Sequence, residues 1–120
     1  MDAPTLATAG NAAMLGQILT SNPAAANARD SANTTALALA AKGGHTACIK
    51  LLVDARADVN ATHPVSLATA LVYAAQAGHA ESVGALLSFG ANPAMVTRKG
   101  KTAQTVAQDK NHTTIVAQLQ

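Results

Sequence analysis

The chain has 120 residues, a length that fits a single domain. Hydrophobic residues make up 49% of the sequence and charged residues 12%, a composition that excludes an intrinsically disordered chain. Lys and Arg outnumber Asp and Glu by eight to six, and the resulting net charge of +2 is too small to indicate a nucleic-acid or membrane partner by itself.

Aromatic and cysteine content narrow the class of protein further. The aromatic residues are Tyr73 and Phe89, so a small-molecule pocket with aromatic walls is not expected. The single cysteine, Cys48, excludes an intramolecular disulfide and fits a reducing compartment. The first ten residues lack the apolar run of a signal peptide, and no later segment resembles a membrane span. We therefore expect a cytoplasmic protein that makes no membrane contact.

The sequence repeats itself with a period of about 33 residues. The segments that begin at Thr35 and Thr69 share a Thr-Ala-Leu start, an Ala-Ala pair and a Gly-His pair in constant register. Segments of weaker similarity before and after them indicate a single domain of four units, of which the first and last are truncated. The units span approximately residues 1–28, 29–61, 62–95 and 96–120.

Each unit is expected to contain two short helices. The first helix of the second unit has Leu37, Ala40 and Ala41 on one face. The second helices of the four units carry, in chain order, the apolar stripes Leu15, Ile18 and Leu19; Ile49, Leu52 and Val53; Val83, Leu86 and Leu87; and Ile115, Val116 and Leu119. Because one helix pair of this size cannot bury its apolar face alone, the pattern predicts an all-α solenoid of stacked pairs.

Residues that tolerate left-handed backbone are expected at the helix ends. They lie between the two helices of each unit at Gly10, Gly44, Gly78 and Asn111. After the second helix the corresponding residues are Asn22, Arg56 and Gly90. Asn22 and Gly90 suit a left-handed cap, whereas a positive φ at Arg56 costs about 1 kcal/mol relative to glycine.

Four short motifs carry a family resemblance. The second unit contains TALALAA, GGH, CIKLLV and RADVNA, and the third contains TALVYAA, AGH, SVGALL and GANPAM. In these motifs the chain resembles ankyrin-repeat proteins over nearly its whole length. The resemblance implies an ankyrin-type helix-turn-helix solenoid with hairpin or loop fingertips.

The chain departs from the family pattern at two positions of each unit. The proline of the family's T-P-L-H stretch is replaced by Ala36, Ala70 and Ala103, and its histidine by Ala38, Val72 and Thr105. The threonines that open the stretch, Thr35, Thr69 and Thr102, can still form hydrogen bonds near a helix start. The loop at 61–69 has one extra residue and a proline, so we expect an irregular fingertip there.

Three regularly spaced histidines, His45, His79 and His112, are candidate metal ligands. Corresponding side chains of stacked helices lie about 8–10 Å apart, whereas zinc–nitrogen bonds are about 2.0–2.1 Å long. We therefore expect each ring to pack at the turn between helices and to bond a neighbouring backbone group. Cys48 lies in an apolar stripe and is expected to be a small buried hydrophobic residue.

The sequence contains no Ser/His/Asp set, phosphate loop or paired carboxylates, so we expect neither catalysis nor a cofactor. The resemblance instead implies that a partner protein binds to the concave face and the fingertips. The matching residues are Arg29, Asp30, Ser31, Thr34 and Lys42 in the second unit, His63, Ser66 and Gln76 in the third, and Arg98, Lys99, Lys101, Asp109 and Lys110 in the fourth.

The stretch TRKGK at 97–101 places three of the eight cationic residues on one fingertip. This cluster is either a solvated turn or an anchor for an acidic segment of a partner protein. The alternative function is a contact with nucleic acid or another polyanion through 98–101, which the small net charge and the shortage of aromatic residues disfavour. We expect the protein to be a monomer. A further alternative is that the chain is a fragment of a longer ankyrin array.

Overall fold

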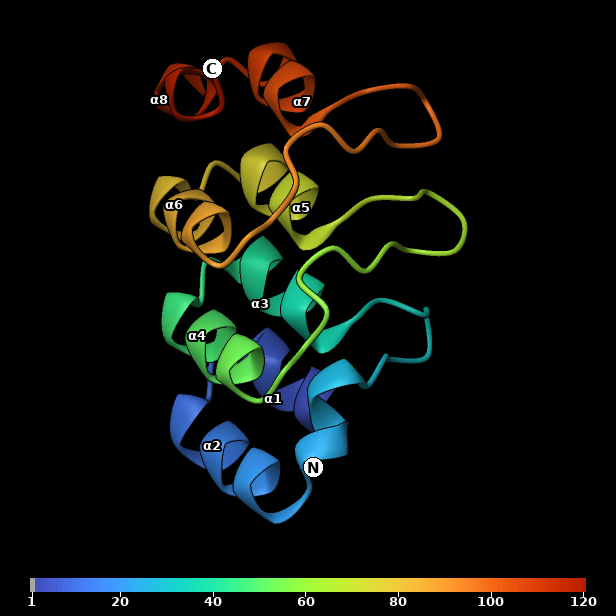
Figure 1. The fold of residues 1–120 in the computed structure, drawn as a ribbon, viewed down its shortest axis with the longest axis vertical. Coiled ribbons are helices and arrows are strands. Elements are labelled where there is room, and N and C mark those ends of the chain that lie inside the picture. The colour runs from blue at the N-terminus through green and yellow to red at the C-terminus, as the bar shows by residue number, and fades with distance from the viewer. Residues whose placement is uncertain (1) are drawn as a thin grey trace.

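The computed structural model describes residues 2–120, which form a stack of four helix pairs (Figure 1). The inner helices, next to the long loops, are α1 (Ala3–Ala9), α3 (Ala36–Gly43), α5 (Ala70–Ala77) and α7 (Ala103–Asp109). The outer helices are α2 (Ala12–Ser21), α4 (Thr46–Asp54), α6 (Ala80–Ser88) and α8 (Thr113–Gln118). A short 3-10 helix, η1 (Pro23–Asn27), follows α2. The predicted all-α solenoid is confirmed.

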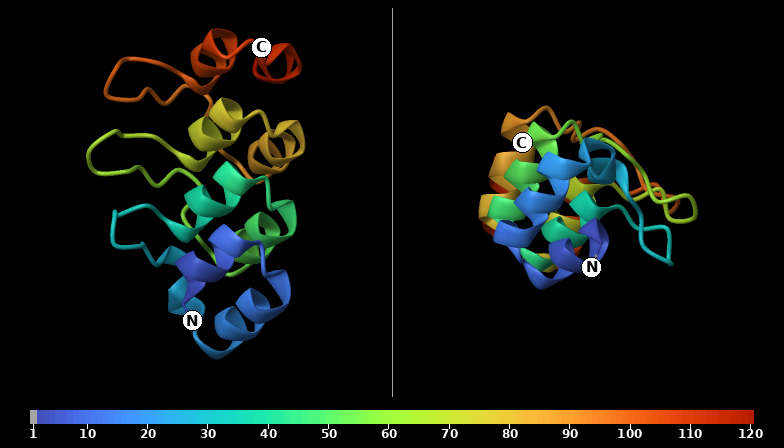
Figure 2. Two further views of the ribbon diagram at one scale, coloured as in Figure 1. Left: turned by 180° about the vertical axis from the view of Figure 1, so that it is seen from behind. Right: turned by 90° about the horizontal axis from the view of Figure 1, so that it is seen from below.

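The helices form two layers along an elongated molecule of 39 × 26 × 21 Å. In the inner layer α3 packs between α1 and α5, and α5 packs between α3 and α7. In the outer layer α4 packs between α2 and α6. Three long loops extend to one side of the inner layer (Figure 2). We name them fingertip 1 (28–35), fingertip 2 (61–69) and fingertip 3 (95–102).

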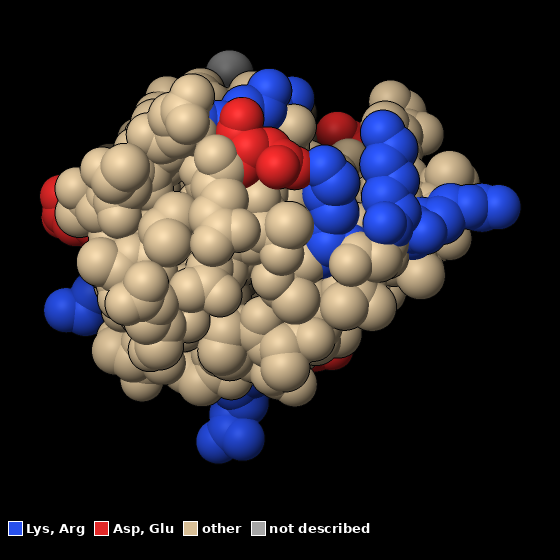
Figure 3. Space-filling model, turned by 90° about the horizontal axis from the view of Figure 1, so that it is seen from above, with Lys and Arg blue, Asp and Glu red and all other residues tan. Residues whose placement is uncertain are grey.

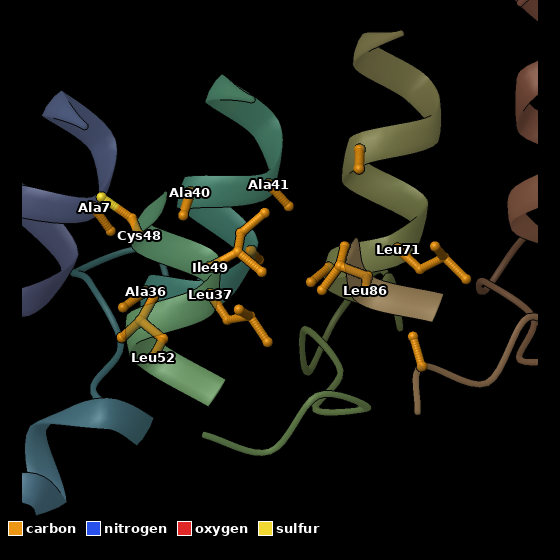
Figure 4. Close-up of a cluster of buried hydrophobic side chains, with 14 of the residues drawn as sticks. Ala7, Ala36, Leu37, Ala40, Ala41, Cys48, Ile49, Leu52, Leu71 and Leu86 are labelled. Carbon is orange, nitrogen blue, oxygen red and sulfur yellow. The ribbon is translucent and has the colours of Figure 1, made fainter. Parts of the chain in front are cut away.

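A core of leucine, isoleucine and alanine runs continuously between the two layers (Figure 4). Leu52 and Leu86, at equivalent positions of α4 and α6, are fully buried, and burial of each stabilises the fold by about 1.5–3 kcal/mol. The inner helices contribute buried alanines, such as Ala40 and Ala74, whose small side chains let neighbouring helices approach closely. The core therefore follows the apolar stripes of the sequence.

Each of the last three inner helices begins at a threonine cap. The Oγ1 atoms of Thr35, Thr69 and Thr102 accept hydrogen bonds from backbone N–H groups three residues later, at 3.0, 3.3 and 3.2 Å. This confirms the local role predicted for these threonines. At α1 the cap is Asp2, which accepts from the Thr5 N–H at 2.9 Å. Hydrogen bonding by the Thr5 side chain, and then by its backbone N–H, lowers the pKa of the Asp2 carboxyl.

The turns between paired helices adopt the predicted left-handed backbone, with φ of 72°, 72°, 83° and 61° at Gly10, Gly44, Gly78 and Asn111. After the second helices, Arg56 and Gly90 are also left-handed, with φ of 72° and 95°. The prediction for Asn22 is wrong, because its φ is −144°. Pro23 follows it directly, and a proline restricts the preceding residue to extended backbone.

Fingertip 2 has a longer turn than its neighbours. Its Leu67 N–H bonds to the carbonyl of His63, four residues back, whereas the turns of fingertips 1 and 3 close over three residues, at Asn33 and Gly100. The extra residue predicted to make this loop irregular is therefore accommodated in the turn itself. Leu67 has a φ of 60°, an uncommon conformation for a bulky side chain.

Candidate functional site

The three recurring histidines connect successive repeats. One nitrogen of each imidazole ring lies within hydrogen-bond distance of a backbone carbonyl near the end of the preceding inner helix. The pairs are His45 Nε2 with Thr8 O at 3.2 Å, His79 Nε2 with Lys42 O at 3.1 Å, and His112 Nδ1 with Ala75 O at 2.9 Å. This confirms the predicted bond to backbone. Among residues 2–120, His, Cys, Asp and Glu form no group of three that could hold a metal ion.

The glycine of each turn is matched to the histidine of the next repeat. A Cβ atom on Gly44 would lie 2.6 Å from His79 Nδ1, closer than non-bonded atoms approach. The same contact recurs between Gly10 and His45 at 2.5 Å and between Gly78 and His112 at 2.9 Å. Each Gly-His motif therefore takes part in two contacts between repeats. Its glycine packs against the histidine ring of the following repeat, and its histidine packs against the glycine of the preceding repeat.

Cys48 is fully buried in α4, and burial raises the pKa of its thiol. It therefore behaves as the small hydrophobic residue that its sequence position predicts. The equivalent residue of α6 is Ser82, which is also fully buried, and its Oγ lies 3.1 Å from Thr46 Oγ1. Both side chains belong to the core and are inaccessible from the surface.

Several residues predicted to face a partner are engaged in holding the fingertips. Arg29 donates through Nη1 to the carbonyls of Asn33, at 2.9 Å, and Thr62, at 3.1 Å, and so joins fingertip 1 to fingertip 2. Asp30 accepts from the N–H groups of Ala32 and Thr34, both at 2.9 Å. These side chains therefore stabilise the loop conformation through hydrogen bonds to the loop backbone.

His63 makes a second link between the same two loops. Its Nδ1 accepts from the N–H of Val65 at 3.1 Å, so the ring proton resides on Nε2, which donates to Ala32 O at 2.8 Å. Of the other residues predicted in this region, Ser31 and Lys42 are exposed and Thr34 is half-buried. None of the residues predicted in the second unit lines the groove that lies between fingertips 2 and 3.

That groove has a volume of about 670 Å³ and lies between fingertips 2 and 3, above helices α5 and α7. Seven of the predicted residues line it: Ser66, Gln76, Arg98, Lys99, Lys101, Asp109 and Lys110. Its apolar surface comes from Val72 and Tyr73 of α5, Val106 of α7 and Val65 of fingertip 2. A bond from the Arg98 N–H to Ser66 O, 2.8 Å long, joins the two fingertips.

The groove is predominantly cationic. Arg98, Lys99, Lys101 and Lys110 face one acidic residue, Asp109, which gives a net charge of +3. Figure 3 shows Lys and Arg gathered on one side of the C-terminal end of the stack. Lys101 and Asp109 form an ion pair, the one salt bridge present within residues 2–120. The other three cationic side chains of the groove are exposed.

The fold and its motifs agree with a known family. A family model described as ankyrin repeats (3 copies) matches residues 5–97. The chain belongs to the ankyrin-repeat family. Ankyrin repeats are generally protein–protein interaction modules and are typically non-catalytic. Within residues 2–120 of this ankyrin-repeat chain, every helix is too short or too polar to cross a membrane.

Two curated relatives share the ankyrin repeats. The mouse ankyrin repeat and SAM domain-containing protein 6 is 35% identical over 94 residues, which cover 78% of this chain and 11% of the mouse protein. A probable E3 ubiquitin-protein ligase of Oryza sativa subsp. japonica is 37% identical over 73 residues, 60% of this chain and 14% of the plant protein. The chain therefore spans only a small part of the length of these relatives.

The apolar part of the groove was missed in the sequence. Val72 occupies the position of the histidine in the family's T-P-L-H stretch, and this departure from the ankyrin pattern is the signal that could have located the groove. Tyr73 is the one tyrosine of the chain and is half-buried beside it. A smaller hollow of about 380 Å³ lies near α1 and includes Asp30 and Leu39.

Proposed function

We propose that this ankyrin-repeat domain is a non-catalytic module that binds an acidic segment of a partner protein in the groove between fingertips 2 and 3. The observation that carries the proposal is the net charge of +3 in a groove whose remaining surface is largely apolar. The whole chain has a net charge of only +2, so the positive charge is concentrated at this site.

Charge and apolar surface have different roles in such a site. Cationic side chains attract an acidic partner, raise the rate of association and select against basic partners. Apolar surface contributes to affinity when the partner covers it. Fingertip 3 presents Arg98 and Lys99 on a short hairpin, closed by the bond from Thr97 N–H to Lys101 O at 2.8 Å. The hairpin holds the two cations at the rim of the groove.

The proposal is tested by removing two charges from the groove and two from elsewhere. The groove variant combines Arg98→Ser and Lys99→Ser. The control variant combines Lys50→Ser and Arg56→Ser, which removes two cationic side chains from α4 and the turn that follows it. Each variant is used for affinity capture from a native lysate, after thermal unfolding has shown that it is folded. We expect the captured partners to be lost only with the groove variant. Equal recovery with both variants would contradict the proposal.

A salt titration with the captured partner distinguishes a protein from a polyanion. For nucleic acid, log K falls with log salt by a slope near the number of phosphates contacted, and it does so for any base sequence. We expect a shallow slope, because few cations line the groove and apolar contacts do not depend on counterion release. A steep slope shared by unrelated oligonucleotides would instead assign the groove to polyanions.

A further inference from the structure

The groove already contains one carboxylate. Asp109, the last residue of α7, pairs with Lys101 of fingertip 3. Both side chains are about half exposed, at 47% and 43%, and an exposed ion pair of this kind is weak in water. A carboxylate from another molecule can therefore replace Asp109 on the lysine at little cost.

Helix stability does not explain the position of Asp109. The C-terminal end of a helix carries partial negative charge, so an acidic side chain there is unfavourable. The equivalent residues of α3 and α5 are Lys42 and Gln76, which do not oppose the helix dipole. The carboxylate at α7 is compensated from outside the helix, by Lys101 of fingertip 3.

Apolar surface borders this ion pair. Val106 and Tyr73 are half-buried in the groove wall, and Val65 of fingertip 2 is 61% exposed at its rim. An apolar side chain that covers this surface removes it from water, which favours binding. The volume of about 670 Å³ is within the range of about 300–1,000 Å³ typical of sites that enclose a ligand.

We infer that the groove binds an extended peptide segment in which a carboxylate lies next to an apolar side chain, and that this carboxylate replaces Asp109 on Lys101. The inference rests on the proposed function and names the chemistry of the partner. Asp109 is then an internal competitor. It occupies Lys101 in the free protein, so it lowers the affinity for ligands that bring a carboxylate to that lysine.

The test measures the fluorescence anisotropy of a short fluorescein-labelled peptide in which glutamates surround one leucine. Asp109→Asn removes the competitor, and we expect it to tighten binding about two- to five-fold. Asp54→Asn is the matched control, because it changes the net charge equally at an exposed site on α4. In a Lys101→Met background the gain from Asp109→Asn should disappear.

Two further peptides test the chemistry of the ligand. The peptide with glutamine in place of glutamate should bind more weakly, and so should the peptide with glycine in place of leucine. Thermal unfolding of each variant shows that the fold is retained.

Three results would overturn the inference. One is an equal gain from Asp54→Asn and Asp109→Asn, and another is a gain that persists with Lys101→Met. The third is an absence of peptide binding by the unmodified protein. If the captured partner still depends on Arg98 and Lys99 in any of these cases, the proposed function stands and only the inference fails.

Discussion

Arg56, two residues after the end of α4, adopts the left-handed conformation, in which a side chain carries a steric cost of about 1 kcal/mol. The equivalent residue after α6 is Gly90, which has no Cβ atom to carry that cost. The backbone geometry required at this position is thus the same in the second and third units, and only the third unit, with Gly90, has the residue that adopts it without strain. Arg56 is exposed, so no buried contact compensates for the strain.

Arg56→Gly is therefore expected to raise the free energy of unfolding by about 0.5–1 kcal/mol, since glycine relieves the strain but has more conformational freedom when unfolded. Urea denaturation measures the change as a higher midpoint at constant m-value. Arg56→Ala is the control, because it removes the charge and keeps a Cβ atom. An equal gain from alanine would show that charge, and not backbone conformation, sets the stability here.

Leu67 has the same type of strain, and in the sequence it lies between Ser66 and Ala68, which both line the groove. Its equivalents in fingertips 1 and 3 are Asn33 and Gly100, two residues suited to a positive φ. Leu67 is 41% exposed, so burial does not offset the cost of its conformation. Strained residues of this kind concentrate at functional sites, and Leu67 follows Ser66, which lines the groove.

At the scale of helices, the contact between a turn glycine and the next histidine couples neighbouring pairs. His79→Ala removes the hydrogen bond to Lys42 O and the packing of the ring on Gly44, and we expect it to lower the free energy of unfolding by about 1–2 kcal/mol. Gly44→Ala is also destabilising, because its φ is 72° and its Cβ would meet the ring.

The double variant shows whether the two residues act through one contact. Gly44→Ala should cost less in the His79→Ala background than in the unmodified chain, because the collision with the ring is absent and only the backbone strain remains. A double-mutant cycle measured by urea denaturation gives this coupling. Strictly additive losses would mean that the glycine and the histidine stabilise the fold independently.

The helices were predictable from the sequence because their signals are local. Thr35 caps α3 by accepting from the N–H three residues later, and the turn at Gly44 needs only a positive φ. Short stretches of sequence therefore determine both the start and the end of the helix. Asn22 was predicted wrongly because the adjacent Pro23 restricts its backbone more strongly than the repeat pattern does.

The candidate site was predictable only in part, because its contacts join residues from different repeats. Arg29 bonds the carbonyl of Thr62, 33 positions away, and no periodic pattern reveals that it is engaged there. Lys101 meets Asp109 because fingertip 3 leads directly back into α7. The apolar wall at Tyr73 is half-buried because the fingertips cover the inner helices incompletely, which depends on loop conformation.

For the whole molecule, the stack means that each helix pair is stabilised mainly by its immediate neighbours. Within residues 2–120 the pair α3–α4 has a neighbouring pair on each side, and so does α5–α6, whereas the pairs α1–α2 and α7–α8 have one each. The exposed residues of α8 are Thr113, Thr114, Ala117 and Gln118, a mostly polar surface. Stability should therefore decrease from the centre of the stack towards the C-terminal end.

Native-state hydrogen exchange measures this gradient directly. We expect the slowest amide exchange in α3 and α5, close to the free energy of global unfolding, and the fastest helical exchange in α8, which has six residues and one buried side chain, Ile115. His112→Ala removes the bond to Ala75 O that joins the last pair to α5, and it should accelerate exchange in α7 and α8 while leaving α1–α4 unchanged. Uniform acceleration in all helices would mean that the stack unfolds as a single cooperative unit, and local opening of the last repeat, which contributes Lys101 and Asp109 to the groove, would then be excluded.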